Sequence, residues 1–331
     1  METRRLICPD IRKIEVESFD LDPTPPDGVL VENLYTAVSI GTEVYNWLEG
    51  SEPGGQRRFP RTTGYCNVGR VLEVGADVEG IQVGDTVAGQ SNHASHAVLR
   101  QSYNLVPSDI EPRQATFTVM GAIALHGIRV AQVRLGESVV VFGLGLVGQI
   151  AAKLARLSGG LPVIGVDLDT FRIEKAVHNG CDIALHPGQV DNLAEEIRRL
   201  CPEDGANVIL ESTGKPEVYP TAVELACLGG RVVAIGSPRG TVTMDFLKDV
   251  HLREVSILGA HQPKTPNDDH IYYRFYKQRE RDLILRLMAI GRLDLESLIT
   301  HTHKPEDCLD VYSALADRPA DTLGVLFDWT D

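Results

Sequence analysis

Residues 139–167 contain one continuous pattern. In order, it predicts a strand, a glycine-rich turn, a helix and a second strand that ends at an acidic residue. The first apolar run is rich in β-branched residues, which predicts a strand buried on both faces. Gly143, Gly145 and Gly148 then form the pattern G-x-G-x-x-G at the turn from strand to helix. Asp167 ends the next apolar run, 19 positions after Gly148. This combination predicts a βαβ unit of a parallel sheet, because each part needs the others in place.

The glycines and the acid of this unit predict a dinucleotide site. Gly143 permits the tight turn, Gly145 lets the backbone approach a pyrophosphate, and Gly148 lets the helix pack close to the strand. The phosphates would bind the exposed amides at the helix N-terminus. A carboxylate at Asp167 accepts hydrogen bonds from the adenosine ribose and repels a 2′-phosphate, which favours NAD over NADP. The predicted contacts in this unit are Gly143, Gly145, Leu146, Val147, Gly148, Asp167, Leu168 and Arg172.

Length and composition limit the class of protein. With 331 residues, two domains are expected. The formal net charge of −14 argues against nucleic acid or an anionic membrane as a partner. No apolar run is long enough to span a bilayer, and no secretory signal is visible in residues 1–10. The six cysteines are widely spaced, so we expect reduced thiols and a cytoplasmic location.

Hydrophobic periodicity divides the chain into a β-rich first part and a βα alternation. Short strands are predicted at residues 30–39, 69–75 and 85–88, a loop at 51–61, and a helix over 111–133. Strands at 139–142, 163–166, 208–211, 231–235 and 255–258 then alternate with helices at 146–157, 170–179, 191–200 and 217–228. That order predicts an α/β fold with a doubly wound parallel sheet. Helices over 272–290 and 305–315 and a strand at 324–327 complete the chain.

Several short motifs, taken in order, resemble the medium-chain dehydrogenase/reductase family. They lie at residues 41–43, 64–75, 83–87, 143–148, 211–214 and 229–236. The resemblance implies a GroES-like β-barrel catalytic domain of residues 1–124 and 263–331, a Rossmann cofactor domain of residues 125–262, and a homodimer. It also adds Ser212, Thr213, Gly236 and Ser237 to the expected cofactor contacts. Residues 41–43, 64–69 and 92–94 are most similar to the bacteriochlorophyllide hydroxyethyl dehydrogenase-like branch.

The zinc ligands of many family members are replaced in this sequence. The resemblance places the first ligand at Ile40, the second at Tyr65 and the third near Met120. Isoleucine cannot bind zinc, and tyrosine and methionine are poor zinc ligands. Residues 89–96 also lack the cysteines of the structural zinc lobe. We therefore expect no zinc at either position.

Four residues are candidates for the chemistry that a metal would otherwise perform. Thr42 falls where the resemblance implies a relay hydroxyl, although it also suits a turn residue that bonds its own backbone. Tyr65 could donate to a substrate oxygen or fill the volume of a lost ligand. His93 is favoured over His96 as an acid or base, with a hydrogen-bonded loop histidine as the alternative. Glu43 could be a base, but we favour a role in binding nearby amides.

Three functions remain open at this level. The first is a zinc-independent, NAD-dependent oxidoreductase that interconverts a secondary alcohol and a ketone on a polar or medium-sized substrate. The second is an enoyl or quinone reductase, although such enzymes usually favour NADPH and Asp167 argues against that cofactor. The third is a non-catalytic nucleotide-binding protein. A change in cofactor absorbance that depends on substrate would separate the third from the other two.

Overall fold

The computed structural model describes residues 2–50, 59–101, 103–317 and 319–330. It divides the chain into two compact units, one of Met1–Met120 with Tyr276–Asp331 and the other of Gly121–Phe275. The chain thus returns to the first unit after Phe275, whereas the sequence placed that return after residue 262. Most of the predicted loop at 51–61 lies outside the described residues. No described helix is long and apolar enough to cross a membrane.

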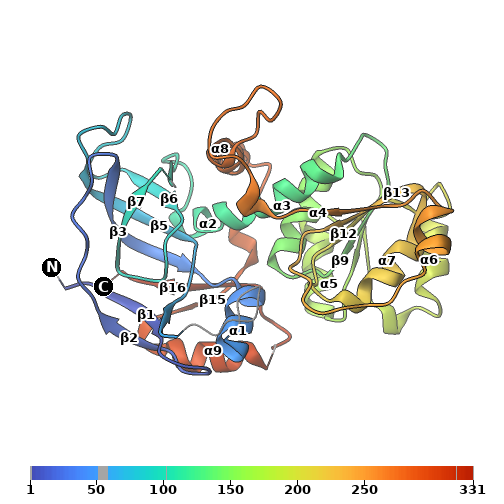
Figure 1. Ribbon diagram of the computed structural model, residues 1–331, viewed down its shortest axis with the longest axis horizontal. Coiled ribbons are helices and arrows are strands. Elements are labelled where there is room, and N and C mark those ends of the chain that lie inside the picture. The colour runs from blue at the N-terminus through green and yellow to red at the C-terminus, as the bar shows by residue number, and fades with distance from the viewer. Residues whose placement is uncertain (1, 51–58, 102, 318, 331) are drawn as a thin grey trace. The chain divides into compact units, whose positions relative to one another are not determined.

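The second unit is the expected doubly wound α/β domain (Figure 1). Its strands are all parallel and are ordered β11-β10-β9-β12-β13-β14. They are β9 (Val139–Phe142), β10 (Val163–Val166), β11 (Ile183–Leu185), β12 (Ala206–Glu211), β13 (Ala226–Ala234) and β14 (Ser256–Gly259). The helices are α3 (Thr118–Ala131, which begins at the end of the first unit), α4 (Leu146–Leu157), α5 (Thr170–Asn179), α6 (Leu193–Leu200) and α7 (Tyr219–Leu225). Every residue of β9 and β10 is buried, so helices must cover both faces of the sheet.

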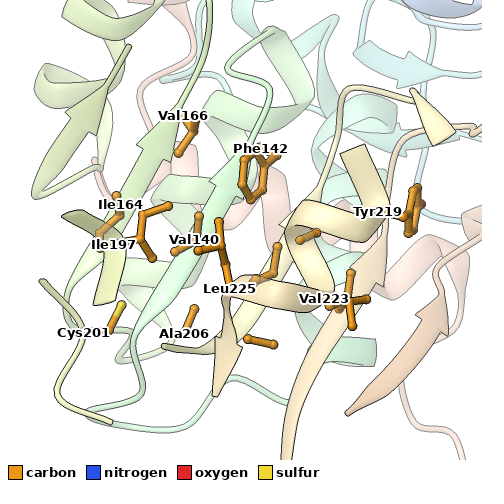
Figure 2. Packing of buried hydrophobic residues seen from close by; sticks show 14 of the residues in the cluster. Val140, Phe142, Ile164, Val166, Ile197, Cys201, Ala206, Tyr219, Val223 and Leu225 are labelled. Atoms are coloured by element: carbon orange, nitrogen blue, oxygen red, sulfur yellow. The ribbon is translucent and has the colours of Figure 1, made fainter. Parts of the chain in front are cut away.

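One apolar cluster holds this sheet against α6 and α7 (Figure 2). Val140 and Phe142 of β9 pack with Ile164 and Val166 of β10, because alternate residues of a strand point to the same face. The helices contribute Ile197, Ala222, Val223 and Leu225 to the same cluster. From β9 the chain runs to β10 and β11 on one side and then crosses to β12 on the other. The carboxyl ends of β9, β10 and β12 therefore meet at the switch point where such folds bind ligands.

The first unit is built on two sheets. A seven-stranded sheet has the order β15-β16-β3-β5-β6-β8, with β7 also paired to β3, and a three-stranded sheet has the order β2-β1-β4. The strands are β1 (Arg4–Cys8), β2 (Glu15–Ser18), β3 (Gly28–Ala37), β4 (Arg61–Thr62), β5 (Asn67–Val74), β6 (Thr86–Gly89), β7 (His96–Arg100), β8 (Tyr103–Leu105), β15 (Ile299–His303) and β16 (Gly324–Asp328). The helices are α1 (Ile40–Glu49), α2 (Pro112–Ala115), α8 (Lys277–Ala289) and α9 (Cys308–Ala316). With the parallel sheet, this separate sheet unit confirms the predicted fold class.

Several elements differ from the prediction; the helix expected over 272–290, for example, begins at Lys277 of α8. The apolar run ending at residue 39 is followed directly by helix α1, which the sequence did not predict. The helix expected over 111–133 is two helices, α2 and α3. The helix expected over 217–228 ends at Leu225, because Ala226 already pairs with Ala206 of β12 and begins β13.

Candidate functional site

The three glycines form the turn from β9 to α4. Gly143 has φ +86°, a conformation that side chains rarely adopt. A Cβ atom on Gly148 would lie 1.9 Å from the carbonyl oxygen of Gly143, so the helix starts in direct contact with the turn. A Cβ atom on Gly145 would meet nothing within 4 Å. The first and third glycines are thus required by packing within the protein, whereas the second faces open space.

The open space at Gly145 adjoins the start of helix α4. Gly145 is the N-cap residue of α4, and no side chain caps the helix there. Leu146 and Val147 begin the helix, and amides of a first helical turn lack partners within the helix. Uncapped amides at a helix N-terminus can bind a phosphate group. A cradle that a side chain would fill, next to these amides, fits the pyrophosphate of a dinucleotide.

Asp167 is bound to the same turn. One carboxylate oxygen accepts a hydrogen bond from the Leu144 amide at 2.6 Å, and the other accepts one from the Asp169 amide at 3.0 Å. Asp169 caps α5 by accepting from the amide of Arg172, whose Nε atom lies 3.8 Å from the same carboxylate. The Asp167 carboxylate is therefore fixed beside the glycine turn, and Arg172 lies next to an acid. Leu168, between the two acids, is largely exposed.

The neighbouring strands bring the remaining predicted residues to this turn. The Ser212 hydroxyl, just after β12, donates to the carbonyl oxygens of Gly143 at 2.6 Å and Phe142 at 2.9 Å. A Cβ atom on Gly143 would lie 2.8 Å from Cγ2 of Thr213. Gly236 lies against the backbone of residues 212–214, and Ser237 lies near Gly214. The predicted cofactor residues thus gather at the carboxyl ends of adjacent strands.

The first unit contains a buried carboxylate, Glu43, in the first turns of α1. Its Oε1 atom accepts from the amide of Ser39 at 2.7 Å, so the side chain returns to the start of its own helix. Its Oε2 atom accepts from the hydroxyls of Thr63 at 2.7 Å and Tyr312 at 2.6 Å. Burial alone would raise the pKa of Glu43, but the His93 imidazole and these hydrogen bonds outweigh it and lower the pKa below its ordinary value. Glu43 is therefore an ionised acceptor.

His93 completes this buried network. Its Nε2 atom lies 3.0 Å from Oε2 of Glu43, and its Nδ1 atom lies 2.7 Å from Oγ1 of Thr36. The indole of Trp329 donates to the same threonine hydroxyl at 2.9 Å. Because ionised Glu43 can only accept, the Nε2 atom must carry a proton. His93 has no exposed surface, and its role as an acid or base stays a prediction. His96 is also buried, beside the Ser95 hydroxyl.

Tyr65 and Thr42 belong to a second group of hydroxyls. The Tyr65 hydroxyl donates to Oγ of Ser39 at 2.5 Å and interacts with the Thr42 side chain. Burial raises the pKa of Tyr65, so the phenol stays protonated and acts as a hydrogen-bond donor. Both residues are partly exposed, unlike His93 and Glu43. Ser39 joins the two groups, because its amide donates to Glu43 while its hydroxyl accepts from Tyr65.

The sequence missed five members of these networks: Thr36, Ser39, Thr63, Tyr312 and Trp329. Tyr312 and Trp329 lie more than 200 positions from Glu43, and nothing in the sequence links them to it. Ser39 carried a usable signal, since a serine followed by an acid in the next helical turn is typical of a helix start. In the second unit, the Nδ1 atom of His126 on α3 lies 3.3 Å from the Thr265 hydroxyl and 3.2 Å from the Tyr273 hydroxyl.

The residues at the expected zinc positions are poor metal ligands in this setting. Ile40 offers no donor atom, Met120 is buried, and the Tyr65 hydroxyl is bound to Ser39. Within the described ranges, no group of three or more His, Cys, Asp or Glu residues could hold a metal ion. Zinc sites in proteins use three or four such ligands. The residues present therefore do not fit a zinc ion.

Comparison with known proteins identifies the family. Residues 147–274 match the family model described as zinc-binding dehydrogenase. The chain is also 32% identical over 249 residues to the D-guloside 3-dehydrogenase of Escherichia coli K12, covering 72% of this chain and 70% of that protein. The chain belongs to the zinc-binding dehydrogenase family. It is an oxidoreductase of the medium-chain dehydrogenase/reductase type, and further relatives are L-threonine and sorbitol dehydrogenases.

Two solved structures share the fold over nearly the whole chain. A protein from Sinorhizobium meliloti 1021 described as a zinc-binding dehydrogenase and bound to NADP has a TM-score of 0.84 at 21% identity, covering 99% of each chain. A protein from E. coli CFT073 described as a short chain alcohol dehydrogenase and complexed with NADH has a TM-score of 0.84 at 18% identity, again covering 99% of each chain. Neighbours of the same fold thus bind either cofactor.

Proposed function

We propose that this protein is an NAD-dependent oxidoreductase that interconverts a secondary alcohol and a ketone without a catalytic zinc ion. The observation that carries the proposal is the open cradle at Gly145, bounded by the uncapped start of α4 and by the fixed carboxylate of Asp167. The bound nicotinamide ring would accept or return a hydride. Relatives that oxidise a hydroxyl of a sugar derivative or an amino acid support an alcohol as the substrate.

Asp167 supports NAD as the preferred cofactor. Its carboxylate lies where the ribose hydroxyls of the adenosine would donate to it, and its charge would repel a 2′-phosphate. Arg172 is the nearest predicted cation, but its Nε atom lies 3.8 Å from Asp169, and that acid would oppose a phosphate beside it. The NADP-bound relative shows that the fold itself does not decide the cofactor.

Tyr65 and Thr42 take the place of the metal in this proposal. In the direction of ketone reduction the substrate oxygen gains negative charge as the hydride arrives, and the neutral Tyr65 phenol can donate to that oxygen when its one proton turns to it from Ser39. In the direction of alcohol oxidation the same phenol oxygen can accept the hydrogen bond of the substrate hydroxyl. Thr42 and Ser39 orient the phenol, and Ser39 is in turn held by Glu43. Glu43 and His93 therefore act as positioning residues, and of these four residues Tyr65 and Thr42 would contact the substrate.

A pair of glycine variants tests the cofactor site. Gly145→Ala should fold normally, because a Cβ atom there meets nothing within 4 Å and the residue has an ordinary φ of −65°. It should nevertheless weaken NADH binding at least tenfold, because the methyl group enters the cradle. Gly259→Ala, at the end of β14, is also clear of neighbouring atoms and has no left-handed φ, so it is a control for a glycine replacement outside the predicted cofactor contacts. Unchanged NADH binding in a folded Gly145→Ala protein would exclude the proposed site.

The proposal also covers the location of the protein in the cell and its oligomeric state. We infer a cytoplasmic homodimer, because all six cysteines are buried and free and because β14 is an edge strand of the parallel sheet. Pairing of two β14 strands would cover this edge. Light scattering of the purified chain at micromolar concentration tests the dimer.

A further inference from the structure

Glu211 is a second buried carboxyl group, and it lies in the unit that contains the glycine turn. It is the last residue of β12, has no exposed surface, and pairs in register with Phe142, the last residue of β9 before that turn. Its Oε1 atom accepts hydrogen bonds from the amide of Thr213 at 2.7 Å and from the Thr213 hydroxyl. The side chain is therefore fixed at the carboxyl end of the sheet, where the predicted cofactor residues gather.

No cation in the described part of the chain neutralises this carboxyl group. Within the described ranges Glu211 forms no ion pair, and its Oε2 atom makes no hydrogen bond of normal geometry. The groups that face it are the backbone of Thr213 and Gly214, the Tyr219 hydroxyl on α7, and the uncharged residues beside it on β9 and β13. A negative charge on Glu211 is thus free to act on a ligand nearby.

The charge of Glu211 changes at an accessible pH. Burial raises the pKa of Glu211 above its ordinary value, while the hydrogen bonds from Thr213 and Gly214 and the Tyr219 hydroxyl act in the opposite direction. Tyr219 stays protonated, because burial and the neighbouring carboxylate raise its pKa. Glu211 is therefore the member of this pair that titrates, at a higher pH than an ordinary glutamate.

The order of the strands separates Glu211 from the adenosine end of the proposed cofactor site. Strand β9 lies between β10 and β12, so Asp167, just after β10, and Glu211 lie on opposite sides of the glycine turn. A dinucleotide with its adenosine ribose at Asp167 and its pyrophosphate at Gly145 would therefore extend its nicotinamide half toward the carboxyl end of β12. Thr213, which Glu211 holds, lies against that turn at Gly143.

We propose that Glu211 lets the protein distinguish the two oxidation states of its cofactor, because its ionised carboxyl group favours NAD⁺ over NADH. The inference rests on the proposed function for the position of the dinucleotide. NAD⁺ carries a positive charge on the nicotinamide ring that NADH lacks, whereas both share the same phosphates and riboses. A buried carboxylate without a counter-ion attracts that charge more strongly than an exposed one, because water and salt screen it less. The neutral carboxyl group, which forms as the pH falls, gives no such attraction.

Calorimetric titration of the full chain with NAD⁺ and with NADH tests this inference. The measured quantity is the ratio of the Kd of NADH to the Kd of NAD⁺, because groups that act on the shared phosphates and riboses cancel in it. As Glu211 loses its proton between about pH 5 and about pH 8, the ratio should rise roughly threefold or more, the effect of one nearby charge. A ratio that does not change with pH would overturn the inference.

Two variants and one control assign the effect to Glu211. Glu211→Gln keeps an oxygen that can accept from Thr213 but removes the charge, so its ratio should be independent of pH and lower than that of the parent at pH 8. Tyr219→Phe retains Glu211 and removes a hydroxyl that favours its ionised form, so the rise should move to higher pH. Glu224→Gln, at an exposed position on α7, should behave like the parent.

The variants also define what would contradict the assignment. A parent-like pH profile in folded Glu211→Gln would show that another group causes the effect. Should Glu211→Gln fail to fold, an unshifted profile in Tyr219→Phe would contradict the assignment in the same way.

The proposed function and this inference fail in different ways. If the protein oxidises an alcohol with NAD⁺ but the ratio does not depend on Glu211, the inference is wrong and the dehydrogenase proposal stands. If the ratio depends on Glu211 but no alcohol reduces NAD⁺, the dehydrogenase proposal is wrong and Glu211 still distinguishes the two forms of the cofactor.

Discussion

The Nε2 atom of His93 lies 3.0 Å from Oε2 of Glu43, and both side chains are buried in the first unit. The pair is satisfied on every side, because Ser39, Thr63 and Tyr312 also donate to the carboxylate. A buried acid with four donors organises the backbone around it. It joins the start of α1, the strand-loop segment before β5 and helix α9, and Tyr65 depends on that arrangement.

Replacement of Glu43 should therefore change stability before it changes chemistry. Glu43→Gln leaves buried donors without an acceptor and should lower the free energy of unfolding by roughly 3 kcal/mol. Since the pKa of Glu43 is lowered on folding, its contribution is complete above the ordinary glutamate pKa and is lost as the pH falls through the folded-state value. Denaturant titrations at pH 7 and pH 4 should show a smaller acid-induced loss in Glu43→Gln than in the parent. An equal loss in both would show that Glu43 does not titrate as described.

Asp167 should set the cofactor preference. Asp167→Asn keeps an oxygen that can accept from the Leu144 amide, but it removes the negative charge that opposes a 2′-phosphate. The ratio of NADPH to NADH affinity should rise roughly tenfold or more, with little change in thermal stability. Fluorescence titration with both cofactors measures this ratio. Tighter binding of NADPH than NADH by the parent chain would overturn the assignment to NAD.

More of the fold than of the candidate site could be predicted from the sequence. Strands β9 and β10 and helices α4 and α5 lie at their predicted bounds, because each is a short apolar or amphipathic run between clear turn residues. The glycine turn and Asp167 were predictable for the same reason, since their contacts lie within about 25 residues of each other in the chain.

The buried network of the first unit could not be predicted, because its contacts are distant in sequence. The Glu43 network draws on β3, the loop before β5, α9 and Trp329, and no local pattern encodes such a meeting. Helix α1 was missed because residues 30–39, which lead into it, are mainly apolar and partly β-branched, and this composition is typical of a strand. The imidazole of His93 could act as an acid or a base, but only the fold reveals that its ring lies against Gly64. A Cβ atom on Gly64 would come within 2.7 Å of the His93 ring.

Turnover should not depend on zinc. Ile40 and Met120 offer no suitable ligand where the family resemblance places them, and Tyr65 is bound to Ser39. Elemental analysis of the purified chain should give far less than one zinc per chain, and incubation with 1,10-phenanthroline should leave the rate unchanged. One tightly bound zinc per chain, removed together with activity, would contradict this.

The exposed edge of β14 should mediate association. Ile257 lies in the middle of this strand and is 39% exposed. Ile257→Lys places a charge on the edge, which blocks strand pairing between copies. Light scattering should show the parent chain at twice the monomer mass and the variant shifted toward the monomer. Glu254→Lys, just before the strand, is a control for the added charge. A monomeric parent chain at micromolar concentration would exclude this interface.

Tyr65 should carry the largest share of the chemistry that this chain itself provides. Tyr65→Phe removes the hydroxyl that donates to Ser39 and retains the ring, so packing and NADH binding should change little. Turnover should fall by roughly a hundredfold, the usual scale for a positioned proton donor. Thr42→Val should lower turnover less, because Thr42 supports the phenol from one side. His93→Ala should lose thermal stability together with activity, whereas Tyr65→Phe should lose activity alone. Near-parent turnover in Tyr65→Phe, measured with an alcohol that the parent oxidises, would move the donor role to Thr42.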